Sequence, residues 1–196
     1  MIWYCFTGSA QGDTSKIKAQ IGLGVNSPSS NGFVSNFKGK SVNFPTVHLG
    51  VQYMFLPRLG AKLDYGFNRV SNESTSPEFK LNYTRLNLQL VYDVSRTIAI
   101  SHRLGTFIHA GPGMSMVTPL GDYGSNDTSF FNMMGGAEFH YGISDKLTLF
   151  LDASYIFGFG DDFNPVETGF GSFNGDMLTV SFGVSVSLSG CYFCGD

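Results

Sequence analysis

Apolar and polar residues alternate along eight segments of this chain, and no other feature restricts its fold so strongly. Side chains of a β-strand point in turn to its two faces, so alternation predicts strands with one apolar and one polar face. The eight segments are residues 17–25, 47–55, 59–68, 85–93, 103–115, 131–141, 147–157 and 178–188. Strands of soluble proteins have about 5–6 residues, whereas a tilted strand that crosses a bilayer needs about 9–11. The length of these segments therefore favours strands that span a membrane.

The charged residues indicate which face of the predicted strands meets lipid. Only 14% of the residues are charged, against roughly 25% in ordinary soluble domains. The polar faces nevertheless include six ionic side chains: Lys62, Asp64, Arg85, Arg103, Glu138 and Asp152. A soluble barrel or sandwich, the alternative fold, would have to bury these charges in its core at a high cost. We therefore expect them to line a lumen while the aliphatic faces contact lipid.

The connections between the segments support a closed barrel. An open sheet edge is untenable in hydrocarbon, because its backbone groups would lack hydrogen-bond partners. We therefore predict an all-β fold, a closed eight-stranded antiparallel up-and-down transmembrane β-barrel. The predicted turns are short near residues 57–58, 95–97 and 144–146, and the predicted loops are long over residues 26–44, 69–78, 117–130 and 158–176. Transmembrane barrels have short periplasmic turns and long external loops, so both chain ends should be periplasmic.

Aromatic residues make up 15% of the chain and gather at the two ends of the predicted outward faces. Tyr and Phe rings favour the level of the lipid headgroups, so rings at both ends of an aliphatic belt predict two aromatic girdles. The predicted girdle residues are Phe55, Tyr92, Phe139 and Tyr141 on the side of the short turns, and Tyr65, Phe67, Tyr155 and Phe157 on the side of the long loops.

The fourth segment breaks the alternation at its start. Phe79, Leu81 and Tyr83 have the opposite parity to the outward residue Leu86. This irregularity predicts either a β-bulge near Thr84 or a strand end that projects beyond the bilayer.

Both ends of the sequence lie outside the alternating pattern. An apolar run over residues 1–6 precedes the small residues Gly8, Ser9 and Ala10, as at a signal-peptidase site. We predict a signal-peptide remnant over residues 1–10, the barrel over 11–188 and the start of a periplasmic linker over 189–196; a buried N-terminal strand is the alternative for the first segment. Cys191 and Cys194 are predicted to form a local disulfide in the oxidising periplasm, and half of a zinc site is the alternative.

Three of these segments resemble the eight-stranded barrel of the OmpA family, in the form found in Bacteroidetes-type bacteria. The resemblance rests on residues 83–92, 109–113 and 149–155, and it extends over about residues 17–188. It implies an outer-membrane location, contact with outer-membrane lipid and lipopolysaccharide, and a structural role in the envelope. Many family members continue into a peptidoglycan-binding domain, which we expect beyond Asp196.

The predicted lumen charges allow two functions. Opposite charges in a narrow lumen should pair, because an unpaired buried charge is costly. Paired charges form a plug in an anchoring protein; a gate for a narrow pore is the first alternative. Adhesion or receptor binding through the external loops is the second alternative, although the loop aromatics Phe130, Phe163, Phe170 and Phe173 are expected to pack among the loops.

Other classes of function lack support in the sequence. The four histidines form no Ser–His pair on the outward face, so we predict no enzyme. Asp161, Asp162, Asn164 and Glu167 are spaced unlike an EF-hand, so we expect a solvated acidic loop, no metal site and no cofactor. The net charge of −3 gives no broad basic face for nucleic acid.

Overall fold

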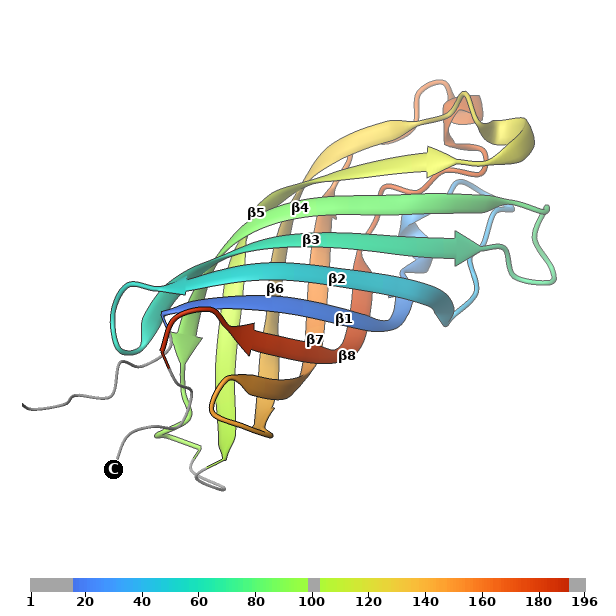
Figure 1. Cartoon of the computed structure of the whole chain (residues 1–196). Coiled ribbons are helices and arrows are strands. Elements are labelled where there is room, and N and C mark those ends of the chain that lie inside the picture. The colour runs from blue at the N-terminus through green and yellow to red at the C-terminus, as the bar shows by residue number, and fades with distance from the viewer. Residues whose placement is uncertain (1–15, 99–102, 191–196) are drawn as a thin grey trace, which may run out of the picture.

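The computed structural model describes residues 16–98 and 103–190, which form eight strands and three short 3-10 helices (Figure 1). The strands are β1 (Ile17–Pro28), β2 (Asn43–Met54), β3 (Leu59–Ser71), β4 (Lys80–Asp93), β5 (Leu104–Pro119), β6 (Thr128–Gly142), β7 (Leu147–Phe159) and β8 (Met177–Ser187). The helices are η1 (Ser30–Gly32), η2 (Gly121–Tyr123) and η3 (Val166–Gly169). None of the helices in the described residues has the length and hydropathy needed to span a bilayer.

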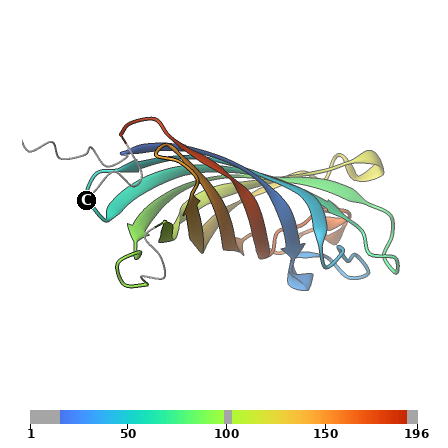
Figure 2. The ribbon, with the colours of Figure 1, turned by 60° about the horizontal axis from the view of Figure 1, so that its bottom comes forward.

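The strands form one closed antiparallel barrel in chain order, as predicted. Each strand pairs with its sequence neighbours, and β1 also pairs with β8, so that Ile21 lies opposite both Leu49 and Val184. The blue and red strands consequently lie side by side in Figure 2. Closure gives every strand a hydrogen-bonded neighbour on both sides, which removes the exposed edges of an open sheet.

The two ends of the barrel differ in the length of their connections. At one end, which we call the turn end, residues 55–58, 94–103 and 143–146 join consecutive strands (Figure 1). The connection over 94–103 is longer than the tight turn predicted at residues 95–97. At the other end, which we call the loop end, residues 29–42, 72–79, 120–127 and 160–176 form the connections and contain the three helices.

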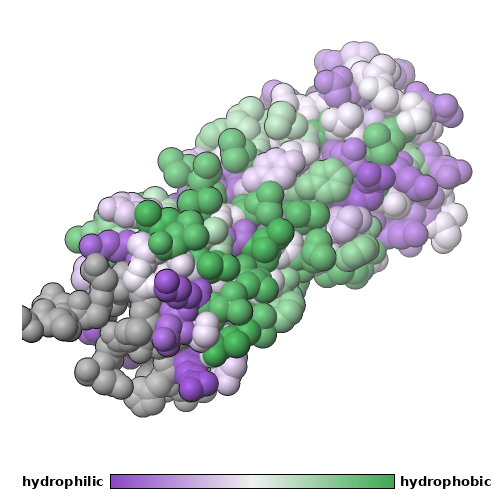
Figure 3. Space-filling model, in the orientation of Figure 1, coloured by the Kyte–Doolittle hydropathy of each residue, from purple (hydrophilic) through white to green (hydrophobic). Residues whose placement is uncertain are grey.

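Alternation places apolar side chains outside the barrel and polar side chains inside it. Leu88 and Leu90 of β4 are 60% and 61% exposed, whereas the alternating residues Asn87 and Gln89 are at most 1% exposed. Figure 3 shows the resulting hydrophobic band between two more hydrophilic ends of the barrel. This arrangement is the reverse of a soluble protein and suits a hydrocarbon solvent.

The strand β4 has no bulge at Thr84, so that explanation of the parity change was wrong. Its pairing with β3 continues without interruption from Lys80 to Tyr92. Leu81 and Tyr83 point into the lumen, as Arg85 and Asn87 do, and both are fully buried. They belong to a hydrophobic cluster that fills the loop end of the lumen, which we call the loop-end cluster. Its buried members are Phe37, Val70, Phe79, Leu81, Tyr83, Val117, Phe130, Met134, Ile156, Phe173 and Met177.

Candidate functional site: the charged lumen

Five of the six ionic residues predicted to line the lumen lie there together. Lys62 and Asp64 come from β3, Arg85 from β4, Glu138 from β6 and Asp152 from β7. All five are at most 1% exposed. We call them the lumen charge cluster. Strand alternation brings them inside, because the residues on either side of each one in its own strand point outward, and all of these neighbours except Thr84 are apolar.

Lys62 joins two walls of the barrel that are not neighbours in the sheet. Its ammonium group forms an ion pair with Glu138 of β6 and lies 3.5 Å from Oδ2 of Asp64. The second carboxylate oxygen of Glu138 accepts a hydrogen bond from Nε2 of Gln20 at 3.0 Å and lies 2.8 Å from Nε2 of His140. Glu138 is thus held by residues of three strands.

Arg85 and Asp64 form the second ion pair, between adjacent strands. Nδ1 of His48 lies 3.3 Å from the other oxygen of Asp64. Gly66 provides the room for this pair, because a Cβ atom there would lie 2.6 Å from Nε of Arg85. A larger residue at position 66 would therefore displace the guanidinium group.

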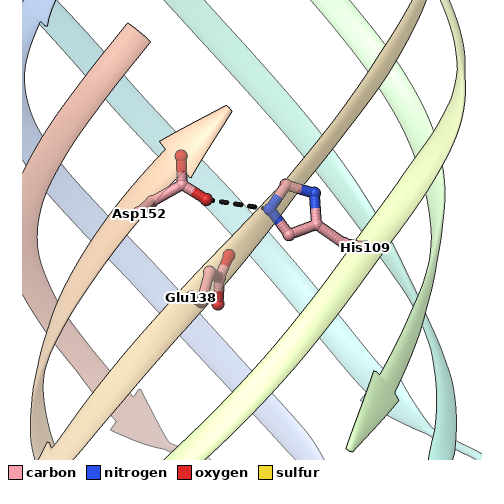
Figure 4. A group of neighbouring side chains, drawn as sticks. All are labelled: His109, Glu138 and Asp152. Atoms are coloured by element: carbon pink, nitrogen blue, oxygen red, sulfur yellow. Dashed lines mark hydrogen bonds and ion pairs between the residues drawn. The ribbon is translucent and has the colours of Figure 1, made fainter. Parts of the chain in front are cut away.

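Asp152 forms the third pair, with His109 of β5 (Figure 4). Nε2 of His109 lies 2.9 Å from one oxygen of Asp152, and the Ser154 hydroxyl donates a hydrogen bond of 2.6 Å to the other. Glu138 and Asp152 are directly opposite each other in the β6–β7 pair. Like charges in such positions repel, so the contacts to Lys62 and His109 stabilise this part of the sheet.

The charges of the lumen balance. Three basic side chains, Lys18, Lys62 and Arg85, accompany the three carboxylates of the lumen charge cluster, and all six side chains are buried. The ammonium of Lys18 also lies 4.6 Å from the centre of the Phe107 ring. Buried charges that are paired and neutral overall destabilise the folded protein much less than one of them would alone. Removing the partner of a buried charge costs about 3–5 kcal/mol.

One group within the lumen has the composition of a metal site. Ligand atoms of His109, Glu138 and Asp152 all lie within 4.8 Å of one another. However, Glu138 is already paired with Lys62, and the two carboxylates are already balanced by the lumen cations. A divalent cation would add two uncompensated charges to this site, so we do not assign a metal to it.

A layer of amides and hydroxyls connects the lumen charge cluster to the loop-end cluster. Nδ2 of Asn87 donates to Asn132 at 2.5 Å, and Nδ2 of Asn132 donates to the Ser115 hydroxyl at 2.8 Å. The Tyr83 hydroxyl is hydrogen-bonded to the same Ser115 oxygen at 2.6 Å, while its ring packs against Phe130 and Phe173. Tyr83 therefore belongs to both regions.

Arg103 lies outside the lumen, so this prediction was wrong. It precedes the first residue of β5, Leu104, and its side chain is exposed at the turn end. Arg103 has the same parity as His109, but parity does not show where the barrel wall ends. Beyond the last pair of the ladder a charged side chain reaches solvent.

The carboxylate partners His48, His109, His140 and Gln20 were not predicted as site residues. The alternating pattern places each of the histidines on an inward face, which was the available signal. Which charge each one contacts depends on the relative heights of distant strands, and no single segment contains that information.

The predicted girdle residues all lie on the outward face. Phe67 is half-buried, and the other seven are between 37% and 51% exposed. Their role at the membrane boundaries stays a prediction. The predicted leader over residues 1–10 and the predicted disulfide between Cys191 and Cys194 lie outside the described residues.

The sequence of the chain matches a protein family over nearly its whole length. A family model described as "Outer membrane protein beta-barrel domain" matches residues 4–185. The chain belongs to this family. It is therefore an outer-membrane β-barrel, in agreement with the outward apolar face. No protein of curated function matches the chain in sequence.

Solved outer-membrane barrels have the same fold at low sequence identity. Neisserial surface protein A is 14% identical with a TM-score of 0.59, and the match covers 88% of this chain and 96% of that one. The N-terminal barrel domain of Pseudomonas aeruginosa OprF is 11% identical with a TM-score of 0.52, covering 88% and 97%. Outer membrane protein AlkL is 17% identical with a TM-score of 0.52, covering 95% and 96%. These similarities establish the fold alone.

Proposed function

We propose that this protein is a structural component of the outer membrane, a barrel that anchors the envelope and whose lumen is closed by a charged plug. The observation that carries the plug is the burial of the lumen charge cluster, in which no side chain is more than 1% exposed. An aqueous channel would instead leave charged side chains along its path in contact with water.

The loop end supports the same conclusion. The loop-end cluster fills the lumen with rings and aliphatic side chains, and Phe173 and Phe37 come from the loops themselves. Of the four aromatic residues predicted in the loops, Phe170 and Phe173 pack in or against this cluster, and Phe130 contributes to it from β6. Solutes would meet an apolar barrier before they reached the charges.

The orientation of the barrel completes the proposal. Transmembrane barrels have long loops outside and short turns in the periplasm, which supports a periplasmic position for the turn end, where β1 begins and β8 ends. Lipid and lipopolysaccharide surround the barrel.

A narrow gated pore is the second candidate. It is favoured by the position of Lys62, which contacts Glu138 and has a second carboxylate, Asp64, 3.5 Å away. Movement of Lys62 from one acid to the other would release the link between β3 and β6 without leaving the ammonium unpaired.

Conductance separates the two candidates. Purified wild-type protein in planar bilayers should show no sustained channel events, because the plug is complete. A gate predicts events in the wild type that become more frequent in Glu138→Ala, and silence in both proteins rejects the gate. Frequent openings of the wild type would overturn the plug.

Anchoring is tested in cells. Deletion of the gene should make the envelope more permeable to detergents and dyes, and expression of the wild-type protein should restore resistance. A deletion strain with unchanged envelope integrity would contradict the structural role. An outward variant such as Leu88→Ile provides a control for expression and membrane insertion.

A further inference from the structure

The described cations of the loop end are confined to one side of the barrel. Lys38, Lys40, Arg69 and Lys80 lie in the β1–β2 loop, β3 and β4. Between Leu104 and Gly190 the chain has a single Lys or Arg, Lys146, which is at the turn end. The loop end of that half of the barrel carries acidic residues instead: Asp122, Asp127, Asp161, Asp162, Glu167 and Asp176.

Arg69 and Lys80 lie on the outward face of the adjacent strands β3 and β4, and Lys40 lies beside them in the β1–β2 loop. The backbone N–H of Lys40 donates to the carbonyl of Ser71 at 2.9 Å, and Ser71 is directly opposite Lys80. Lateral neighbours in a sheet point to the same face, so Ser71 and Lys80 share the outward face, and the hydrogen bond places the exposed residue Lys40 in a row with them on the other side of Ser71. Arg69 lies two residues below Ser71 in β3, on the same face. We call Lys40, Arg69 and Lys80 the rim patch.

The rim patch contains polar atoms that lack a partner. Nε of Arg69 and Oδ1 of Asn82 are buried without a hydrogen bond, and the two residues are directly opposite each other in the β3–β4 pair. An unsatisfied buried donor costs about 1–3 kcal/mol. Arg69 as a whole is half-buried on the outward face, and a guanidinium group binds phosphate through two parallel N–H groups, so a phosphate would reach Arg69 from the lipid side.

The surface directly below the rim patch has the profile of a lipid. Moving along the barrel wall from Arg69 and Asn82, the next outward pairs are Phe67 with Thr84, then Tyr65 with Leu86, then Leu63 with Leu88. Cations are thus followed by aromatic rings and then by aliphatic side chains. An amphiphile with an anionic headgroup and acyl chains matches this sequence of chemistries.

The acidic residues near the rim patch do not cancel it. Glu73 lies beside Lys38, since its N–H donates to the Lys38 carbonyl at 2.8 Å, and Glu78 precedes β4. Four cations against these two acids leave an excess of two positive charges. Both acids belong to the loop over residues 72–79, farther from the aliphatic belt than Arg69.

We propose that the rim patch binds the phosphate group of a phosphorylated lipid in the leaflet that surrounds the loop end, with its acyl chains against Tyr65, Leu86 and Leu63. Arg69 binds the phosphate, and Lys40 and Lys80 lie on either side of Ser71 in the row above it. The inference depends on the membrane orientation proposed above, and it names the lipid partner of that barrel.

Binding of diphosphoryl lipid A to the purified full chain in zwitterionic detergent tests the site. The triple variant Lys40→Gln, Arg69→Gln, Lys80→Gln should bind about a hundredfold more weakly than the wild type, because each of the three cations near an anionic headgroup contributes about 1 kcal/mol. The matched control removes the same charge at the turn end, with Arg58→Gln, Arg96→Gln and Lys146→Gln, and should bind like the wild type. Dephosphorylated lipid A should bind the wild type as weakly as diphosphoryl lipid A binds the rim variant.

Three outcomes would overturn the site. Equal losses in the rim and control variants would indicate attraction by net charge alone. Equal binding of dephosphorylated lipid would show that phosphate is not recognised. Saturation by inorganic phosphate at the lipid concentrations used would indicate a site for a free anion. Because the titration uses purified protein, its result is independent of the envelope phenotype that tests the proposed function.

Discussion

In the turn-side half of the lumen, side chains of different strands contact one another through ion pairs. At the loop end, they do so through packing of rings and aliphatic side chains. In the first half, Lys62 joins β3 to β6 by a single contact between two atoms. In the second half, Leu81, Ile156 and Met177 from three strands are fully buried against loop residues. The loss of one partner leaves a charge stranded in the first case, but only a cavity in the second.

The difference between the two halves shows why one barrel contains both ion pairs and apolar packing in its lumen. Apolar packing at the loop end closes the lumen without a directional requirement, so loops of irregular shape can contribute to it. Paired charges need fixed heights on separate strands, which a regular sheet provides. The amide layer around Asn87 and Asn132 connects the two halves.

The largest effect should come from breaking a buried pair. Glu138→Ala removes the partner of Lys62, His140 and Gln20, and should lower the free energy of unfolding by about 3–5 kcal/mol. Urea titration of the protein in lipid vesicles, monitored by far-UV circular dichroism, measures this loss. The double variant Lys62→Met, Glu138→Leu removes both charges and should be clearly more stable than the single variant. Equal instability of both would contradict the role assigned to the charge pair.

The loop-end cluster should be sensitive to volume instead. Ile156→Ala leaves a cavity in a region where Ile156 is fully buried, and should cost about 2–4 kcal/mol. The same vesicle titration applies. Leu151→Ala on the same strand points to lipid and is the matched control, with a much smaller expected loss. Similar losses at both positions would mean that the loop end is loosely packed.

The space around Arg85 gives a prediction for the charged half alone. Gly66→Ala places a Cβ atom against the guanidinium group and should cost about 1–3 kcal/mol by overpacking. Gly135→Ala is the control, because a Cβ atom there would meet nothing closer than 3.8 Å. If the urea midpoint of unfolding were unchanged in both variants, the Arg85 side chain would have moved aside without cost, which would contradict this prediction.

The smallest effect concerns the residue shared by the two halves. Tyr83→Phe keeps the ring in the loop-end cluster and removes the hydrogen bond to Ser115, which should cost about 1 kcal/mol. Tyr92→Phe, on the outward face, should change the stability little. A loss at Tyr83 above that of Ile156→Ala would reverse the comparison between the two regions.

Strand alternation predicted the barrel and most of the lumen, since parity alone assigns a side chain to a face. The alternation also showed that Phe79, Leu81 and Tyr83 have inward parity, but one of the two explanations offered, a bulge near Thr84, was wrong. These residues face a lumen that the loops have already covered, and loop conformation is not contained in the strand pattern. The prediction for Arg103 failed for a related reason. The last paired residue of a strand depends on where the neighbouring strand ends, and the sequence of one segment does not contain this information. The ion pairs themselves join residues such as Lys62 and Glu138, whose proximity depends on the closed sheet.

The contact between β1 and β8 also limits how this protein can be made. The first strand obtains its second neighbour only from the last one, so nearly the entire chain must be present before either is satisfied. Contacts between such distant parts of a chain slow folding. A partial sheet would also expose the unpaired backbone groups of its two edge strands to the acyl chains. Insertion should therefore occur as a single concerted event late in biogenesis, with carriers required to protect the unfinished polypeptide until its final hairpin arrives.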